Sequence, residues 1–171
     1  MYKAALIALP FCSFGDLSEL LQQLNHRGFR LRVLSLDGHP VTTAEGIRVL
    51  ADTSLQDTVP WDLQLIVIPG GQYASEVWGD IRLHRFLRQY DGHRGWIATS
   101  KEGVICLAGA GLLGGTRYSA PAHVVKTFGH LLRHAIHTIE PVTVDANVIS
   151  SDGTQSATFS KMVFERLDLT Q

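Results

Sequence analysis

The sequence predicts an α/β protein in which a mostly parallel β-sheet is covered by helices on both faces. Two observations predict this fold. Apolar runs of strand length alternate along the chain with segments whose apolar residues recur at helical spacing. In addition, the chain has 171 residues, 45% of them hydrophobic, and a chain of this length can bury a full core without disulfides or a structural metal. We therefore expect a single domain over residues 1–171.

The first third of the chain predicts two strands with a helix between them. Residues 4–9 form a continuous apolar run, and residues 16–25 place four leucines at helical spacing. Gly28 ends this helix, and residues 30–36 alternate as a second strand. The mixed segment 41–58 is expected to hold short strands or an excursion at the edge of the sheet.

The middle of the chain continues the alternation. Residues 63–68 indicate a buried strand that stops at a Pro-Gly-Gly turn, residues 69–71, because proline lacks an N–H donor and glycine permits positive φ. Residues 81–90 predict a helix, residues 95–99 a short buried strand, and residues 104–108 a further helix.

The last third of the chain predicts shorter elements. Residues 124–134 indicate a helix, residues 142–144 and 147–150 short strands, and residues 157–167 a C-terminal helix. Since strands and helices alternate over most of the sequence, crossover helices between parallel strands are the expected connections.

Charge and composition exclude several classes of function. The chain has 15 Lys and Arg against 16 Asp and Glu, without the basic excess typical of nucleic-acid binding. No apolar stretch approaches the roughly 20 residues of a membrane span. The apolar N-terminal run is followed by Pro10 rather than by a cleavage site. Cys12 and Cys106 are too few and too far apart for a disulfide framework or a zinc site, so we expect a cytoplasmic protein.

Chemistry is expected at the carboxyl ends of the strands, where open α/β sheets bind ligands. Three strand ends carry residues suited to it, at 12–16, 69–71 and 99–103. The last has the form of a nucleophile elbow, a strained strand-to-helix turn that exposes one side chain while a following glycine lets the helix pack closely. Lys101 would be the exposed residue, and Gly103 the glycine.

Four segments in this order resemble the ThiJ/PfpI superfamily of class I glutamine-amidotransferase-like domains. They are VLSLDG with GIRVLAD (33–38 and 46–52), IVIPGG (66–71), the elbow, and AGLLGG (110–115). VLSLDG and GIRVLAD look most like the branch that includes isonitrile hydratases and the amidotransferase-like domains fused to AraC-type regulators. The resemblance covers nearly the whole chain, and it implies a flavodoxin-like three-layer sandwich and a homodimer.

The resemblance also implies a cysteine at the elbow, which this chain lacks. In the family the Ala-Gly-Leu-Leu signature begins nine residues after the nucleophile, and nine residues before Ala110 stands Lys101. Cys106 is four residues before Ala110, inside the predicted helix, where a small buried side chain is expected rather than an exposed thiolate.

Two further site residues are carried over from the resemblance. Asp16 matches the acidic residue that follows the first strand in the family, although it also reads as a helix N-cap, with Glu19 completing a capping box. The family histidine falls on Pro121, so that position has lost its base. His123, two residues further on, is the remaining candidate base.

Lys101 has three possible roles. Its pKa could be lowered so that it acts as a base or a Schiff-base amine, or it could pair with Asp16, Glu102 or a neighbouring subunit, or it could fill an inactive site. Backbone N–H donors at the Gly70-Gly71 turn and at Glu102 do not depend on a cysteine, so an anion or carbonyl could still bind.

These features lead to a main hypothesis and an alternative. The main one is a divergent ThiJ/PfpI protein without cysteine catalysis that binds or senses a small molecule. A regulatory domain related to AraC-fused sensors, which would bind a small ligand without turnover, is a further possibility. The alternative is a hydrolase, lyase or hydratase acting on a small carbonyl-like or isonitrile-like substrate, with Lys101 and Asp16 as its catalytic residues.

No metal or cofactor is expected. His130, His134 and His137 fall at i, i+4 and i+7, but no carboxylate or cysteine joins them at ligand spacing. The glycines at 109–115 follow a helix rather than open one, so they lack the arrangement that binds a dinucleotide.

Overall fold

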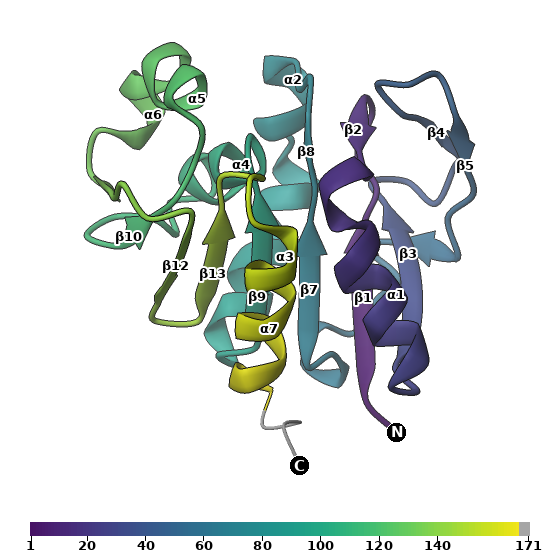
Figure 1. Ribbon diagram of the computed structural model, residues 1–171. Coiled ribbons are helices and arrows are strands. Elements are labelled where there is room, and N and C mark those ends of the chain that lie inside the picture. The colour runs from purple at the N-terminus through teal and green to yellow at the C-terminus, as the bar shows by residue number, and fades with distance from the viewer. Residues whose placement is uncertain (168–171) are drawn as a thin grey trace.

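A seven-stranded sheet forms the centre of the protein (Figure 1). The computed structural model describes residues 1–167. The strand order is β12-β13-β9-β7-β1-β3-β6, and all neighbours pair parallel except β12, which is antiparallel to β13. The strands are β1 (Lys3–Ile7), β3 (Arg30–Ser35), β6 (Thr53–Ser54), β7 (Leu65–Ile68), β9 (Trp96–Ser100), β12 (Val142–Asp145) and β13 (Val148–Ser151).

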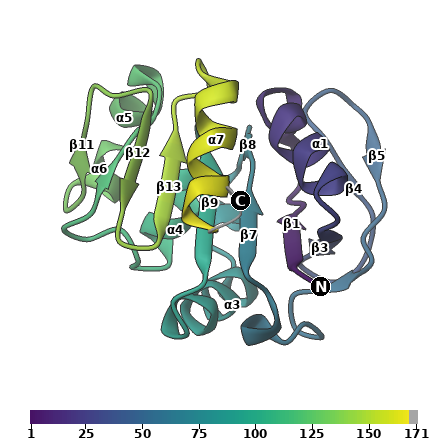
Figure 2. The same cartoon turned by 60° about the horizontal axis from the view of Figure 1, so that its bottom comes forward.

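Helices cover both faces of this sheet (Figure 1 and Figure 2). α1 (Ser18–His26) and α7 (Ser156–Arg166) pack side by side on one face. α3 (Ile81–Gly92) and α4 (Gly103–Gly109) pack on the other. The three-layer, mostly parallel α/β fold predicted from the sequence is therefore confirmed.

The core on each face follows from the alternation of side chains along the strands. In β1, Ala5 and Ile7 join the hydrophobic cluster that contains the buried side chains of α3 and α4. Ala4 and Leu6 point the other way, into the cluster that α1 and α7 cover. A strand buried on both faces has no polar alternation, which is why residues 4–9 form an unbroken apolar run.

Short strands and helices surround the sheet, most of them near the carboxyl ends of its strands (Figure 1). The segment 41–58, predicted to hold short strands or an edge excursion, contains a hairpin and the edge strand β6. The short elements are β2 (Cys12–Ser13), β4 (Val41–Thr42), β5 (Arg48–Val49), β8 (Gly70–Gly71), α2 (Ser75–Trp78), β10 (Arg117–Tyr118), α5 (Ala122–Thr127), α6 (Gly129–Leu132) and β11 (Ile136–His137), with 3₁₀ turns at Gly15–Leu17 and Pro60–Asp62.

The single helix predicted for residues 124–134 is wrong, because the structure has two short helices there, α5 and α6. Phe128 closes α5, since its N–H donates to the carbonyl oxygen of Val124 at 2.9 Å, and its own φ of −110° lies outside the helical range. α6 begins at the next residue, Gly129. The helical spacing of apolar residues continues through the break and hides it from sequence inspection.

The order of the strands reverses between β1 and β7. From β1 the chain moves to β3 on one side, and it later returns to β7 on the other side of β1. The loops that follow β1 and β7 meet at this point, where β2 pairs antiparallel with β8, Cys12 opposite Gly71 and Ser13 opposite Gly70. Ligands of open α/β sheets bind beside such a reversal.

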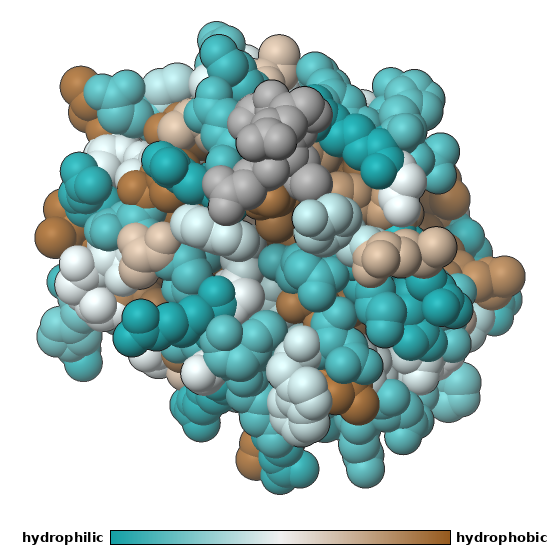
Figure 3. All heavy atoms as spheres, turned by 90° about the horizontal axis from the view of Figure 1, so that it is seen from below, coloured by the Kyte–Doolittle hydropathy of each residue, from teal (hydrophilic) through white to brown (hydrophobic). Residues whose placement is uncertain are grey.

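The opposite end of the molecule shows a mixed surface. Seen from below, hydrophobic residues are scattered among hydrophilic ones over the described part of this face (Figure 3). Within residues 1–167, none of the helices has the length and apolar character needed to cross a membrane.

Candidate functional site

The turn between β9 and α4 holds Lys101 in a strained backbone conformation. Its φ is 51°, in the left-handed region that residues other than glycine rarely adopt. The Lys101 N–H donates to the carbonyl oxygen of Ser151 at 2.9 Å, which ties the turn to the end of β13. At Gly103, a Cβ would lie 2.1 Å from Thr99 Oγ1, so only glycine lets α4 start this close to the sheet. The strand-to-helix turn predicted at residues 99–103 is therefore formed.

The side chain of Lys101 lies over the loop between β13 and α7. A Cβ placed on Gly153 would be 2.3 Å from Lys101 Cε and 3.2 Å from Cγ, so the aliphatic stem rests on the bare backbone of Gly153. Across the described residues, the ammonium group of Lys101 makes no hydrogen bond or ion pair. The pairing with Asp16 or Glu102 considered from the sequence does not occur.

Glu102 occupies the backbone donor that was expected to serve an anion. Its Oε2 accepts the Gly71 N–H at 3.1 Å, and its Oε1 lies 3.3 Å from His123 Nε2. The absence of a side chain at Gly70 makes room for this contact, because a Cβ there would lie 2.8 Å from Glu102 Oε2. The structure thus brings together Glu102, Gly70, Gly71 and His123, next to Lys101.

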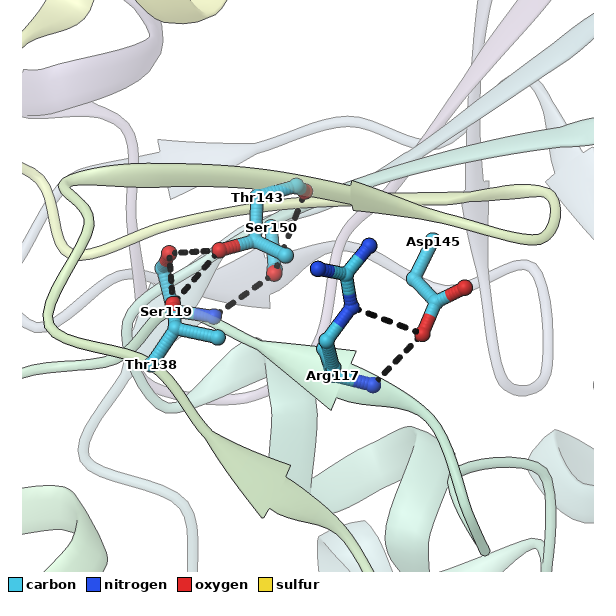
Figure 4. Close-up of polar contacts among 6 residues, drawn as sticks. All are labelled: Arg117, Ser119, Thr138, Thr143, Asp145 and Ser150. Atoms are coloured by element: carbon cyan, nitrogen blue, oxygen red, sulfur yellow. Dashed lines mark hydrogen bonds and ion pairs between the residues drawn. The ribbon is translucent and has the colours of Figure 1, made fainter.

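The segment that carries His123 is anchored by a buried cluster of hydroxyl groups (Figure 4). Ser119 Oγ donates to the carbonyl oxygen of Glu140 at 2.6 Å and lies 2.6 Å from Thr143 Oγ1. The Ser119 N–H donates to Ser150 Oγ at 2.8 Å, so the cluster joins the segment before α5 to β12 and β13. The other residues drawn in Figure 4 are Arg117, Thr138 and Asp145.

Asp16 faces β9 rather than its own helix. The Ser100 hydroxyl donates to Asp16 Oδ2, and Ser100 is fully buried. The capping box predicted with Glu19 is wrong: the N-cap of α1 is Leu17, which makes no side-chain cap bond, and Glu19 accepts from Gln23 instead. The reason is the 3₁₀ turn Gly15–Leu17, which puts Asp16 one turn before α1 and directs its carboxylate across the sheet edge.

Neither cysteine is available as a nucleophile. Cys12 in β2 and Cys106 in α4 are both fully buried. Burial raises the pKa of the Cys12 thiol to about 11 and that of the Cys106 thiol to about 12, so both are protonated at neutral pH. The buried position predicted for Cys106 inside a helix is confirmed.

Residues 3–166 match the sequence model of the DJ-1/PfpI family. The chain belongs to the DJ-1/PfpI family. No curated protein matches its sequence at a significant level. The family resemblance expected from the Pro-Gly-Gly turn and the Ala-Gly-Leu-Leu segment is thereby confirmed at the level of the family.

Solved structures share the DJ-1/PfpI fold over nearly the whole chain. A two-domain protein of Anabaena variabilis, with DJ-1/ThiJ/PfpI-like and ferritin-like domains, aligns with a TM-score of 0.87 and 20% identity, over 98% of this chain and 48% of that one. Drosophila melanogaster DJ-1beta aligns at 0.84 and 24%, over 99% and 91%. An AraC family transcriptional regulator of Pseudomonas putida aligns at 0.79 and 21%, over 98% and 92%. This chain therefore spans about half the length of the Anabaena protein.

Three residues of this DJ-1/PfpI domain escaped sequence inspection. Ser100 holds Asp16, Gly153 carries the stem of Lys101, and the Tyr73 hydroxyl donates to the carbonyl oxygens of Pro69 and Gly70 at 2.5 and 3.1 Å. Burial raises the pKa of Tyr73, so its hydroxyl stays a donor that fixes the turn after β7. Gly153 had a signal, since an Asp-Gly pair follows the strand at 147–150 and marks a fourth strand end.

The histidines considered as metal ligands do not gather. His130 lies in α6, His134 in the following turn and His137 in β11, where its ring is within 3.1 Å of the carbonyl oxygen of Ala120. Over residues 1–167, no three His, Cys, Asp or Glu side chains come together in a way that could hold a metal ion.

Proposed function

We propose that this DJ-1/PfpI domain binds or senses a small molecule at Lys101, which stands at the elbow where the family usually has its cysteine. One observation carries the proposal: the side chain at the left-handed strand-to-helix turn is an amine, while both thiols of the chain lie buried elsewhere. Thiols whose pKa values are about 11 and about 12 do not supply a thiolate at neutral pH.

The charges around the turn favour an anionic or carbonyl ligand. Glu102 is already engaged by Gly71 and His123, and Asp16 by Ser100. The Lys101 ammonium is left without a partner among the described residues, so a carboxylate or a polarised carbonyl oxygen is the complement that it lacks. The Glu102 carboxylate on the Gly71 N–H shows that an anionic oxygen fits this backbone donor.

The fold of the AraC family regulator supports a sensing role by analogy. We place this chain in the branch of isonitrile hydratases and AraC-fused domains on its VLSLDG and GIRVLAD segments. A homodimer in the cytoplasm is part of the same proposal, in line with the two free cysteines. Light scattering that gives a mass near 18.8 kDa would contradict the dimer.

A titration with matched variants tests ligand binding. Small carboxylates and small aldehydes are added to the protein and to Lys101→Met, and binding is followed by calorimetry and by thermal shift. Lys126→Met is the control, because Lys126 is an exposed lysine on nearby α5. We expect saturable binding that Lys101→Met abolishes and Lys126→Met retains. Equal binding by all three proteins, or none by any, would refute the proposal.

The alternative function, an enzyme that uses Lys101 as an amine or a base, is favoured by the unpartnered amine on a strained turn. Condensation of the amine with an aldehyde forms an imine and releases water, and borohydride then reduces the imine to a stable secondary amine. Mass spectrometry of the Lys101 peptide detects this adduct. Its absence, together with unchanged turnover in Lys101→Ala, would exclude the enzyme hypothesis. The Asp16 carboxylate is bonded to the Ser100 hydroxyl and forms no ion pair with the Lys101 amine, which favours the binding role.

A further inference from the structure

A cavity separate from the Lys101 site lies at the ends of β1 and β3. Its volume is about 430 Å³, a size typical of small-molecule sites. Lys101 follows β9, and β7 stands between β9 and β1 in the sheet, so the paired strands β2 and β8 separate the two places (Figure 1). Most of the cavity wall is apolar, formed by Pro10, Phe11, Leu36, Pro40 and Val41.

Phe11 in this wall has a strained backbone. Its φ is 66°, a conformation that is uncommon for a bulky residue and would cost nothing at glycine. The strain is fixed from both sides, because the Phe11 N–H donates to the Thr42 carbonyl oxygen at 2.9 Å and its own carbonyl oxygen accepts the Gln72 N–H at 3.0 Å. The result is an aromatic side chain that is 51% exposed at the cavity. Strain of this kind concentrates at ligand sites.

Four polar residues complete the lining: the opposite charges Arg82 and Asp37, together with His39 and Thr42. Arg82 uses Nε and Nη2 to bind Asp80, which leaves its Nη1 donors without a partner within the described residues. Hydrogen bonds from the backbone and ring of His39 lower the pKa of Asp37, so its carboxylate is charged at neutral pH. Asp37 and Arg82 form no ion pair with each other in the part of the chain that the structure describes.

We propose that this cavity binds a small zwitterion, namely a free α-amino acid with an apolar side chain. Its carboxylate would meet the Nη1 donors of Arg82 and its ammonium group the Asp37 carboxylate, while the side chain packs against Phe11 and Val41.

The lining disfavours other classes of ligand. A simple anion would satisfy Arg82 but would meet the like charge of Asp37, and a simple cation would face the opposite conflict. A wholly apolar ligand would cover the Nη1 donors of Arg82 and the exposed side of the Asp37 carboxylate without giving either a polar partner, which costs free energy. A molecule that carries both charges on one carbon, next to an apolar group, pairs each charge and buries the apolar wall.

Calorimetric titration with L-leucine and L-phenylalanine tests this site, with N-acetyl-leucine and leucine amide as analogues that each lack one charge. We expect saturable binding of the amino acids, and a loss of about tenfold for each analogue, which corresponds to about 1.4 kcal/mol. No binding of either amino acid, or equal binding of the two analogues and L-leucine, would overturn the proposal.

Variants locate the binding on the chain. Arg82→Met and Asp37→Asn should each weaken leucine binding, whereas Arg85→Met, at an exposed arginine outside this lining, should leave it unchanged. Arg82→Met also loses the hydrogen bonds from Arg82 to Asp80. If that variant does not fold, leucine binding by Asp37→Asn decides whether the cavity is the binding site. Lys101→Met should bind leucine normally, which separates this cavity from the Lys101 site. Full binding by Asp37→Asn would contradict the proposal.

A glycine at position 11 distinguishes a ligand role of Phe11 from a structural one. Phe11→Gly relieves the left-handed strain, so its melting temperature should not fall, yet its leucine binding should weaken because the ring is gone. A variant that unfolds at a lower temperature and binds leucine as tightly as the unchanged protein would show that the ring serves the fold instead.

Discussion

Replacing Gly153 by alanine tests how the Lys101 side chain is held. The new Cβ would lie 2.3 Å from Lys101 Cε, which is closer than two non-bonded carbon atoms can pack. Cε is near the free end of a flexible side chain, so the stem can rotate away at low cost. The remaining cost is that of the backbone, because φ is +87° and an L residue there loses about 1–2 kcal/mol.

Gly111→Ala is the matched control for this prediction. Gly111 has φ +77°, and a Cβ on it would have no neighbour within 4 Å, so its replacement carries backbone strain without a clash. Urea unfolding should give both variants the same loss, about 1–2 kcal/mol. In a chain of this size that loss lowers the melting temperature by about 2–8 °C.

The displacement of the lysine needs a second measurement. The rate at which an acylating reagent modifies Lys101, followed by mass spectrometry, should change in Gly153→Ala and stay constant in Gly111→Ala. A loss of more than about 3 kcal/mol in Gly153→Ala would show that the stem cannot rotate away. An unchanged modification rate would show that Lys101 does not rest on Gly153, and either result would refute the reasoning.

Three further predictions concern the surroundings of the site. Glu102→Ala removes the acceptor of the Gly71 N–H and should lower the free energy of unfolding by about 1 kcal/mol, since water replaces part of the bond; urea unfolding measures it. Raising the pH should destabilise the protein through Cys12 and Cys106, because unfolded thiols ionise near pH 9.0 while the folded ones stay protonated to about 11 and about 12. Below pH 9 the two thiols do not lower the free energy of unfolding. At about pH 10 each thiol has lowered it by about 1.4 kcal/mol, which unfolding measurements at several pH values can show. Ser119→Ala leaves buried partners unsatisfied and should cost about 1–3 kcal/mol in urea unfolding.

Each of these three predictions has a control variant or a result that would contradict it. Glu76→Ala, at an exposed glutamate of α2, should leave stability unchanged, and an equal loss there would undermine the Glu102 argument. Cys106→Ala should remove about half of the pH effect that the two thiols cause, and an identical pH profile would show that buried thiols are not its source. A cost below about 0.5 kcal/mol for Ser119→Ala would mean that the hydroxyl cluster does not anchor its segment.

The fold could be predicted because its strands are buried on both faces. Residues 4–9 and 65–68 are apolar without interruption, which is typical of strands buried on both faces of a sheet. The short elements outside the central strands were harder to predict. The helix break at Phe128 depends on its backbone φ rather than on residue type, and short strands such as β10 and β11 carry too few residues to show a period.

The candidate site could be predicted in part. Glycines at 70, 71 and 103 indicate places where chain segments approach closely. In the structure, other segments do lie close to each of these three glycines. The orientation of Asp16 could not be predicted, because an aspartate before a helix reads as a cap unless its partner across the sheet, Ser100, is known. Contacts between residues 84 positions apart leave no local pattern in a sequence.

The left-handed conformation of Lys101 separates the most stable version of this chain from the version that presents an amine. Glycine at position 101 would relieve the turn of about 1 kcal/mol of strain, and the same holds at Phe11, in the wall of the separate cavity. Laboratory selection for heat resistance alone should therefore enrich glycine at both positions. Selection for retained ligand binding should keep the lysine and the phenylalanine, so the difference between the two enrichment maps would mark both sites without knowledge of either ligand.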